Sequence, residues 1–86
     1  MAKIEIYTSA TCPYCDAAKS LLKLKGLNWK EIRIDEDKSQ HEAMLTRTHG
    51  RRTVPQIFIN DQLIGGYDDL MAADRDGKLA EHLEQA

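Results

Sequence analysis

The chain has 86 residues and a net charge of -2, with 12 lysines and arginines against 14 aspartates and glutamates. That length predicts a single domain, residues 1–86, with one modest hydrophobic core. The charge balance lacks the basic footprint of a nucleic-acid-binding protein. Hydrophobic residues make up 42% and charged residues 30%, which argues against disorder, and the apolar runs are too short for a membrane span.

The two cysteines, Cys12 and Cys15, lie close together near the N-terminus. A disulfide across so short a loop adds little stability by constraining the unfolded chain. The segment from Met1 to Tyr7 lacks the apolar core of a signal peptide, so we expect a cytoplasmic protein. In that reducing compartment a close cysteine pair is typical of metal binding or redox chemistry, and not of a structural staple.

The N-terminal part of the chain predicts a strand, a helix and a second strand. Residues 3–8 alternate polar and apolar side chains, which is a strand pattern. Thr11 stands at the N-cap position of the helix that follows, and Gly26 ends that helix. Residues 28–34 carry three well-spaced apolar side chains and predict a strand. Together these elements have the size of a βαβ unit with parallel strands.

The middle of the chain predicts a second helix and a hairpin. Residues 39–42, Ser-Gln-His-Glu, form a capping box that opens a helix, which ends near His49. Two short strands follow at residues 56–59 and 62–64. The Asn-Asp pair at 60–61 suits a tight turn between them.

The C-terminal part predicts one interrupted helical region. Gly65 and Gly66 end the last strand, and Asp68 and Asp69 favour the first turn of a third helix. Gly77 interrupts this helix before a short final one. The order β-α-β-α-β-β-α predicts an α/β fold in which helices flank a four-stranded mixed β-sheet, the layout of the thioredoxin fold.

The segment Cys12-Pro13-Tyr14-Cys15 follows a strand directly and opens a helix. Unpaired N–H groups and the helix dipole stabilise negative charge at a helix start, so the pKa of a cysteine there can fall to somewhere between ~3.5 and ~7.5. Cys15, one turn later, shares its helix face with apolar residues and is expected to be more buried. The pair therefore divides into an attacking thiol, Cys12, and a resolving thiol, Cys15.

Two alternatives remain open for the cysteines at this point. A structural zinc site needs four ligands, and the chain offers only His41, His49 and His82 besides the cysteines, without the spacing of a ligand pair. The second alternative is that the cysteines have no function. A redox Cys-x-x-Cys explains the position at a strand–helix junction better than either.

A proline opens the third predicted strand. Pro55 follows the β-branched residue Val54, which is compatible with a cis bond. Propensity by itself favours the trans bond, because only ~5–6% of X–Pro bonds in folded proteins are cis.

Three segments of the chain together resemble the signatures of bacterial dithiol glutaredoxins. They are Cys12–Cys15, Thr53–Ile59 and Gly65–Leu70, in the order and spacing of that family. The resemblance implies a thioredoxin fold and a cis bond between Val54 and Pro55. It also implies reduction of protein disulfides and glutathione mixed disulfides, with glutathione as co-substrate and neither a metal nor a tightly bound cofactor.

The resemblance further implies roles for individual residues. Cys12 attacks and Cys15 resolves, with Pro13 and Tyr14 between them in the catalytic segment. The backbone of Val54 pairs with the cysteine of glutathione like an added strand. The residues implied for glutathione binding are Tyr14, Arg52, Thr53, Val54, Pro55, Gly66, Tyr67, Asp68 and Asp69.

The two ends of glutathione are assigned to different segments. Its glutamyl carboxylate lies at the N–H groups that open the third helix, because helix N-termini bind anions. Asp68 and Asp69 pair with the glutamyl ammonium, and Arg52 holds the glycine carboxylate. For the neighbouring Arg51 two interpretations are about equally good: it supplies positive charge near the site, or it is a solvated loop arginine.

The chain departs from the family pattern at two positions. Ser9 stands where many members carry a lysine, three residues before the first cysteine, so one source of thiolate stabilisation is missing. Tyr67 stands where members often carry a cysteine, so an additional oxidisable thiol is absent there.

Two other functions remain as alternatives. Iron-sulfur carriers of the family hold a bridging cluster with glutathione, and usually have one active-site cysteine followed by glycine. Pro13 and Cys15 argue against that function. A thioredoxin-type reductant recycled by a flavoprotein is the second alternative, and the segment Gly65–Asp69 argues against it.

The resemblance also implies partners. These are disulfide-bonded or glutathionylated client proteins, with ribonucleotide reductase among the family possibilities. We expect a monomer that binds neither nucleic acid nor a membrane.

Overall fold

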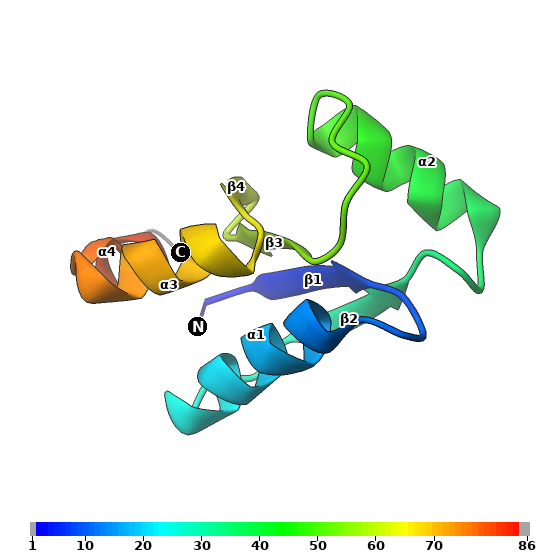
Figure 1. The fold of residues 1–86 in the computed structure, drawn as a ribbon. Helices are drawn as coiled ribbons and strands as arrows, with labels where there is room; N and C mark the ends of the chain where they lie inside the picture. The colour runs from blue at the N-terminus through cyan, green and yellow to red at the C-terminus, as the bar shows by residue number, and fades with distance from the viewer. Residues whose placement is uncertain (1, 85–86) are drawn as a thin grey trace.

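The computed structural model describes residues 2–84, which form a mixed sheet with helices on both faces (Figure 1). No helix in this part of the chain combines the length and apolar character needed to cross a membrane. The elements in chain order are β1 (Ile4–Thr8), α1 (Pro13–Leu24), β2 (Lys30–Arg33), α2 (Lys38–Arg47), β3 (Gln56–Ile59), β4 (Gln62–Gly65), α3 (Tyr67–Arg75) and α4 (Lys78–Leu83).

The four strands lie in the order β2-β1-β3-β4. The strands β1 and β2 are parallel, with Ile6 opposite Glu31, because α1 carries the chain back between them. The pairs β1–β3 and β3–β4 are antiparallel. The predicted four-stranded mixed sheet and its connections are therefore confirmed.

One face of the sheet is apolar and packs against α1, α3 and α4. Alternate residues of β1 and β3 point to this face, as the two-residue period of a strand requires. Figure 1 shows α2 on the opposite side of the sheet from α1. The core cluster consists of Ile4, Ile6, Ala18, Leu22, Ile57, Ile59, Leu70 and Leu79, all at most 4% exposed.

The other face is smaller and partly polar. Tyr7 and Phe58 pack there against Met44 of α2. The Arg47 guanidinium lies 3.8 Å from the centre of the Phe58 ring, donates to the Tyr7 hydroxyl at 2.9 Å, and reaches Glu5 at 3.0 Å. A guanidinium removed from water is attracted to the face of an aromatic ring. Arg47 therefore holds α2 against the sheet although little apolar surface lies between them.

The hairpin between β3 and β4 turns at the predicted pair. Asn60 and Asp61 both have positive φ, at 50° and 67°. Two consecutive left-handed residues define a type I′ turn, whose twist matches that of the flanking strands. The prediction of a tight turn is confirmed.

The second helix begins earlier than the sequence predicts. Its N-cap is Asp37, whose carboxylate accepts from the Ser39 N–H at 2.9 Å and from the Ser39 hydroxyl at 2.6 Å. The predicted capping box at residues 39–42 is therefore wrong, because Ser39 already lies in the first turn. The helix ends at Arg47, and His49 turns the chain with a φ of 59°.

Candidate active site

The site begins at the N-terminus of α1. Cys12 is the N-cap, with extended backbone angles, and its Sγ accepts a hydrogen bond from the Cys15 N–H at 3.1 Å. Pro13 follows at the first helical position, where it leaves no donor unpaired. The sequence predicted Thr11 as the cap, which is wrong by one residue, because the cysteine sulfur itself occupies the capping position.

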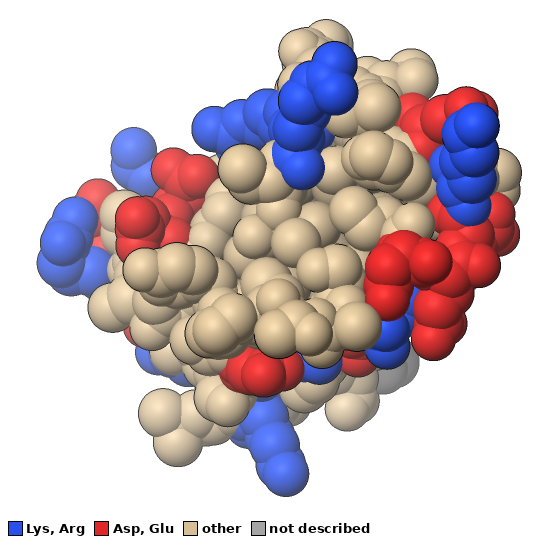
Figure 2. Space-filling model, turned by 45° about the vertical axis from the view of Figure 1, so that its right-hand side comes forward, with Lys and Arg blue, Asp and Glu red and all other residues tan. Residues whose placement is uncertain are grey.

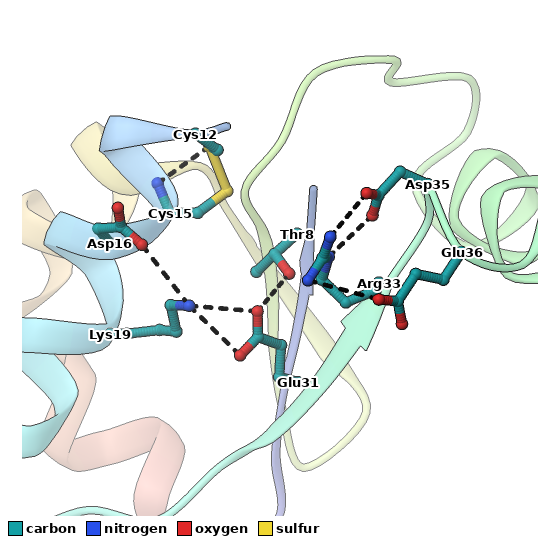
Figure 3. A network of polar contacts seen from close by, with 9 residues as sticks. All are labelled: Thr8, Cys12, Cys15, Asp16, Lys19, Glu31, Arg33, Asp35 and Glu36. Carbon is teal, nitrogen blue, oxygen red and sulfur yellow. Dashed lines mark hydrogen bonds and ion pairs between the residues drawn. A yellow bond between two sulfur atoms is a disulfide. The ribbon is translucent and has the colours of Figure 1, made fainter. Parts of the chain in front are cut away.

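The two cysteines are joined in a disulfide. Figure 3 shows the bond between the two sulfurs. Cys12 is partly exposed, whereas Cys15 is 1% exposed and belongs to the buried core. The predicted difference in burial between the two sulfurs is confirmed. An incoming thiol therefore reaches the Cys12 sulfur first.

The Cys12 sulfur borders a loop that comes from the far side of the sheet. Its Sγ lies 3.8 Å from the Val54 carbonyl oxygen. The Val54–Pro55 bond is cis, as the family resemblance implies. Within residues 2–84, Val54 makes no backbone hydrogen bond of its own, so its N–H is available to a ligand beside the sulfur.

A cleft of about 390 Å³ opens next to Val54. That volume is in the range of small-molecule sites in proteins. Its walls come from the start of α1, the loop before β3 and the start of α3, which are far apart in the sequence. The lining residues are Tyr14, Arg51, Thr53, Val54, Pro55, Gln56, Gly66, Tyr67, Asp68 and Asp69.

Most of the residues predicted to bind glutathione line this cleft. Arg52 is the exception: it is exposed and does not line the cleft. Its neighbour Arg51 does, because the Arg51 N–H is held at 3.0 Å by the Thr48 hydroxyl and its guanidinium lies 3.4 Å from Gln56 Oε1.

Gln56 lines the cleft but was not singled out in the sequence. It is 2% exposed, and its amide nitrogen donates to the Thr53 carbonyl at 3.0 Å. Its side chain thereby braces the loop that carries Val54. No local pattern marks such a glutamine, since its contacts depend on the fold of the loop.

The start of α3 uses its two aspartates differently. The Asp69 carboxylate accepts from the Gly66 N–H at 3.0 Å and lies 3.9 Å from the Arg51 guanidinium. Asp68 is exposed and makes no side-chain hydrogen bond or ion pair with any residue from 2 to 84. Asp69 therefore caps the helix, and Asp68 is free to meet a ligand.

Gly65 is required by both its backbone angle and its surroundings. Its φ is +119°, in the region that favours glycine. A Cβ at this position would collide with the Asp69 carboxylate and would lie 2.8 Å from the Arg51 guanidinium. The absence of a side chain lets the last residue of β4 pass beneath the ion pair.

Two tyrosines border the cleft. The rings of Tyr14 and Tyr67 lie with their centres 6.0 Å apart at an interplanar angle of 33°. Tyr14 is 65% exposed, so its ring presents an apolar surface to any bound molecule. In Figure 2 the side of the molecule that carries the loop between β1 and α1 faces the reader. Uncharged side chains cover the centre of this view, and charged side chains lie at its margin.

A family model for glutaredoxin matches residues 4–64. The chain belongs to the glutaredoxin family. A probable glutaredoxin of Synechocystis sp. is 56% identical over 78 residues, which are 91% of this chain and 89% of that protein. Glutaredoxin 3 of Escherichia coli is 54% identical over 79 residues, 92% of this chain and 94% of that protein. This glutaredoxin is a glutathione-dependent thiol-disulfide oxidoreductase with a Cys-x-x-Cys dithiol.

Solved structures agree with the family assignment. A crystal structure of a buckwheat glutaredoxin–glutathione complex matches with a TM-score of 0.86 at 32% identity, covering 98% of this chain and 78% of that one. A solution structure of glutaredoxin from Brucella melitensis matches with a TM-score of 0.80 at 42% identity, covering 94% and 87%. The predicted thioredoxin fold is confirmed.

Proposed function

We propose that Cys12 is the attacking thiolate of this glutaredoxin and that Cys15 is the resolving thiol. The observation that carries the proposal is the position of the Cys12 sulfur, which caps α1 and accepts from the Cys15 N–H at 3.1 Å. An N–H group aimed at the sulfur and the positive end of the helix both favour the thiolate. The thiolate is the form that attacks disulfides.

The dithiol reaction on a client disulfide proceeds in two exchanges. The Cys12 thiolate attacks one client sulfur, a mixed disulfide forms, and the other client sulfur leaves as a thiolate that takes up a proton. Cys15 then loses its proton and attacks the Cys12 sulfur, which releases the second client thiolate and forms the Cys12–Cys15 disulfide. Two glutathione molecules reduce that disulfide and leave as oxidised glutathione.

Glutathione binds in the cleft with its cysteine against the backbone of Val54. Its glutamyl carboxylate meets the N–H groups of Tyr67 and Asp68, and the Asp68 carboxylate faces its ammonium. The position of Arg51 on the cleft wall supports this arginine, in place of Arg52, as the partner of the glycine carboxylate.

Clients and location are proposed on the same basis. The clients are disulfide-bonded or glutathionylated proteins, ribonucleotide reductase being one candidate, and the exposed, uncharged ring of Tyr14 in the Cys12–Cys15 segment supports docking with little desolvation of fixed charge. A dithiol that cycles with glutathione fits the cytoplasm, whose glutathione pool is kept reduced. We propose that the protein acts there as a monomer and without a tightly bound cofactor.

The test compares two sources of electrons. The oxidised protein is mixed with a glutathionylated peptide and NADPH, together with either glutathione and glutathione reductase or thioredoxin reductase. We expect turnover only with the glutathione system. Turnover with thioredoxin reductase alone would support the thioredoxin-like alternative, and visible absorbance of protein purified without air would support the iron-sulfur alternative.

A further inference from the structure

A polar network joins three elements behind the disulfide (Figure 3). The Thr8 hydroxyl, at the end of β1, donates to Glu31 Oε2 on β2 at 2.6 Å. Lys19 Nζ, on α1, lies 3.3 Å and 3.1 Å from the two oxygens of the same carboxylate. Lys19 also lies 3.6 Å from Asp16 Oδ1 in the first turn of α1.

This network adjoins the resolving cysteine. Lys19 follows Cys15 by four residues, so the two side chains lie on the same face of α1, and Asp16 is the next residue after Cys15. Cys15 and Thr8 are both buried, at 1% and 0% exposed. The network therefore fastens the helix turn that carries Cys15 to the end of β1 and to β2.

The carboxylate at the centre of the network is ionised at neutral pH. The hydrogen bond from the Thr8 hydroxyl, followed by the contact with Lys19, holds the pKa of Glu31 below its ordinary value, although burial opposes the shift. The Lys19 side chain is 25% exposed and the Glu31 side chain 33%. An ion pair this accessible to water adds little to stability, so the contact between Lys19 and Glu31 is not explained by folding alone.

We propose that Lys19 is a positioning residue for the resolving step, which holds Cys15 in line with the Cys12 sulfur. This inference rests on the proposed roles of the two cysteines. In that step Cys15 gives its proton to water, its sulfur bonds to Cys12, and the bond from Cys12 to the client sulfur breaks with the electron pair on the leaving thiolate. Intramolecular steps between held groups are sensitive to small displacements. When glutathione resolves a mixed disulfide instead, Cys15 takes no part and Lys19 has no effect.

The test compares Lys19→Met with Lys25→Met. Lys25 lies at the other end of α1, where its Nζ is 2.6 Å from Asp74, so the control also removes one helix ion pair but far along the helix from Cys15. We expect Lys19→Met to lower kcat for a disulfide-bonded peptide by about tenfold. We expect less than a twofold change for a glutathionylated peptide, and less than twofold on both substrates for Lys25→Met.

Two further variants separate positioning from loss of folding. Lys19→Arg keeps the charge and the contact with Glu31, so it should restore at least half of the dithiol activity. Thr8→Val removes the hydroxyl without changing side-chain size, and should lower dithiol activity in the same direction as Lys19→Met. Thermal melts of all variants identify any that have unfolded.

A combination with Cys15→Ser tests whether Lys19 acts through the resolving thiol. In that background Lys19→Met should leave turnover of the glutathionylated peptide unchanged. Equal losses on both substrates, no loss on the disulfide peptide, or a further loss in the Cys15→Ser background would each overturn the proposal. A failure of the proposed cysteine roles would be seen in a different variant, because Cys12→Ser would then keep activity.

Discussion

Two helix starts border the same cleft, and they are capped in different ways. At the start of α1 the capping atom is the Cys12 sulfur, which accepts from the Cys15 N–H. At the start of α3 the capping atom belongs to Asp69, which accepts from the Gly66 N–H and lies beside Arg51. One helix start thus has a reactive atom at its N–H groups, and the other has a fixed carboxylate.

The difference shows how one physical feature performs two tasks. Unpaired N–H groups and the helix dipole favour negative charge at any helix N-terminus. In the proposed mechanism, the charge at α1 is the reacting Cys12 thiolate, and the Cys15 N–H donates to that sulfur. At α3 one acid fills the cap and leaves Asp68 and the remaining N–H groups to recognise the paired charges of a glutamyl end. We therefore assign chemistry to α1 and glutathione specificity to α3.

The largest expected effect comes from the cysteines at the α1 start. Cys12→Ser should abolish activity on all substrates, because it removes the nucleophile. Cys15→Ser should retain turnover of glutathionylated peptides, since glutathione can resolve the intermediate, but should lose reduction of a disulfide-bonded peptide. Steady-state assays of both variants on both substrates test this division. Equal loss of activity for the two variants on the glutathionylated peptide would contradict the division into an attacking and a resolving cysteine.

The second effect is on the titration of Cys12. Because the helix start favours the thiolate, the Cys12 thiol in the Cys15→Ser variant should titrate below the ordinary cysteine pKa of ~8.5. Ser9, in place of a lysine, contributes no charge to this shift. Ultraviolet absorbance of the thiolate against pH gives the midpoint. A midpoint at or above ~8.5 would mean that the α1 start does not activate the sulfur.

The third effect distinguishes the two glycines before α3. Gly65→Ala should destabilise the protein by about 1–3 kcal/mol, because alanine is strained at positive φ and its Cβ collides with the ion pair. The same variant should weaken saturation by glutathionylated peptides. Gly66→Ala is the control, because its Cβ would lie 3.5 Å from the Pro55 carbonyl, an ordinary contact.

Urea denaturation and steady-state kinetics test this pair. We expect the midpoint of denaturation to fall clearly for Gly65→Ala and little for Gly66→Ala. Equal midpoints for the two variants would show that the ion pair above Gly65 is not held as the structure places it.

The smallest expected effect is a pH dependence of stability that arises from Glu31, which contacts Lys19 of α1. Since the Thr8 hydroxyl and then Lys19 hold the pKa of Glu31 below its ordinary value of 4.5, its contribution to stability is fully present above that value. The contribution is lost as the pH falls through the lower, folded-state pKa. The stability difference between the native protein and Glu31→Gln should therefore shrink on acidification below about pH 4.5. Thermal melts over that range measure it, and a constant difference would contradict the expected titration.

The sheet and its connections could be predicted because several positions in each strand and turn point to the same structure. In the strands this is the alternation of polar and apolar residues, and in the turns it is the type of residue. The alternation of residues 3–8 and the Asn-Asp pair at 60–61 each specify one geometry. Helix starts are less determined. Asp37 and Ser39 are both good caps, and Cys12 competes with Thr11, so small differences in backbone path decide which side chain reaches the N–H groups.

The lining of the cleft was predicted well at Val54 and Gly66, where the backbone borders the cleft. It was predicted less well where a long side chain does. Arg51 and Arg52 are equivalent in the sequence, and the hydrogen bond from the Arg51 N–H to Thr48 helps to fix the loop so that Arg51 lines the cleft. That bond depends on how the loop packs after α2, which no local pattern specifies.

The central claim assigns chemistry to the start of α1 and glutathione specificity to the start of α3. Its most direct test measures substrate preference and the Cys12 titration in the same variant, Asp68→Lys. We predict that the ratio of kcat/KM for a glutathionylated peptide to that for the same peptide carrying cysteine falls about tenfold, equivalent to ~1.4 kcal/mol, from loss of a charge-assisted contact. The titration midpoint of Cys12 should stay unchanged. Asp76→Lys, the same charge change at the other end of α3, should leave both quantities as they are in the native protein. An unchanged ratio in folded Asp68→Lys would contradict the assignment of glutathione specificity to the α3 start.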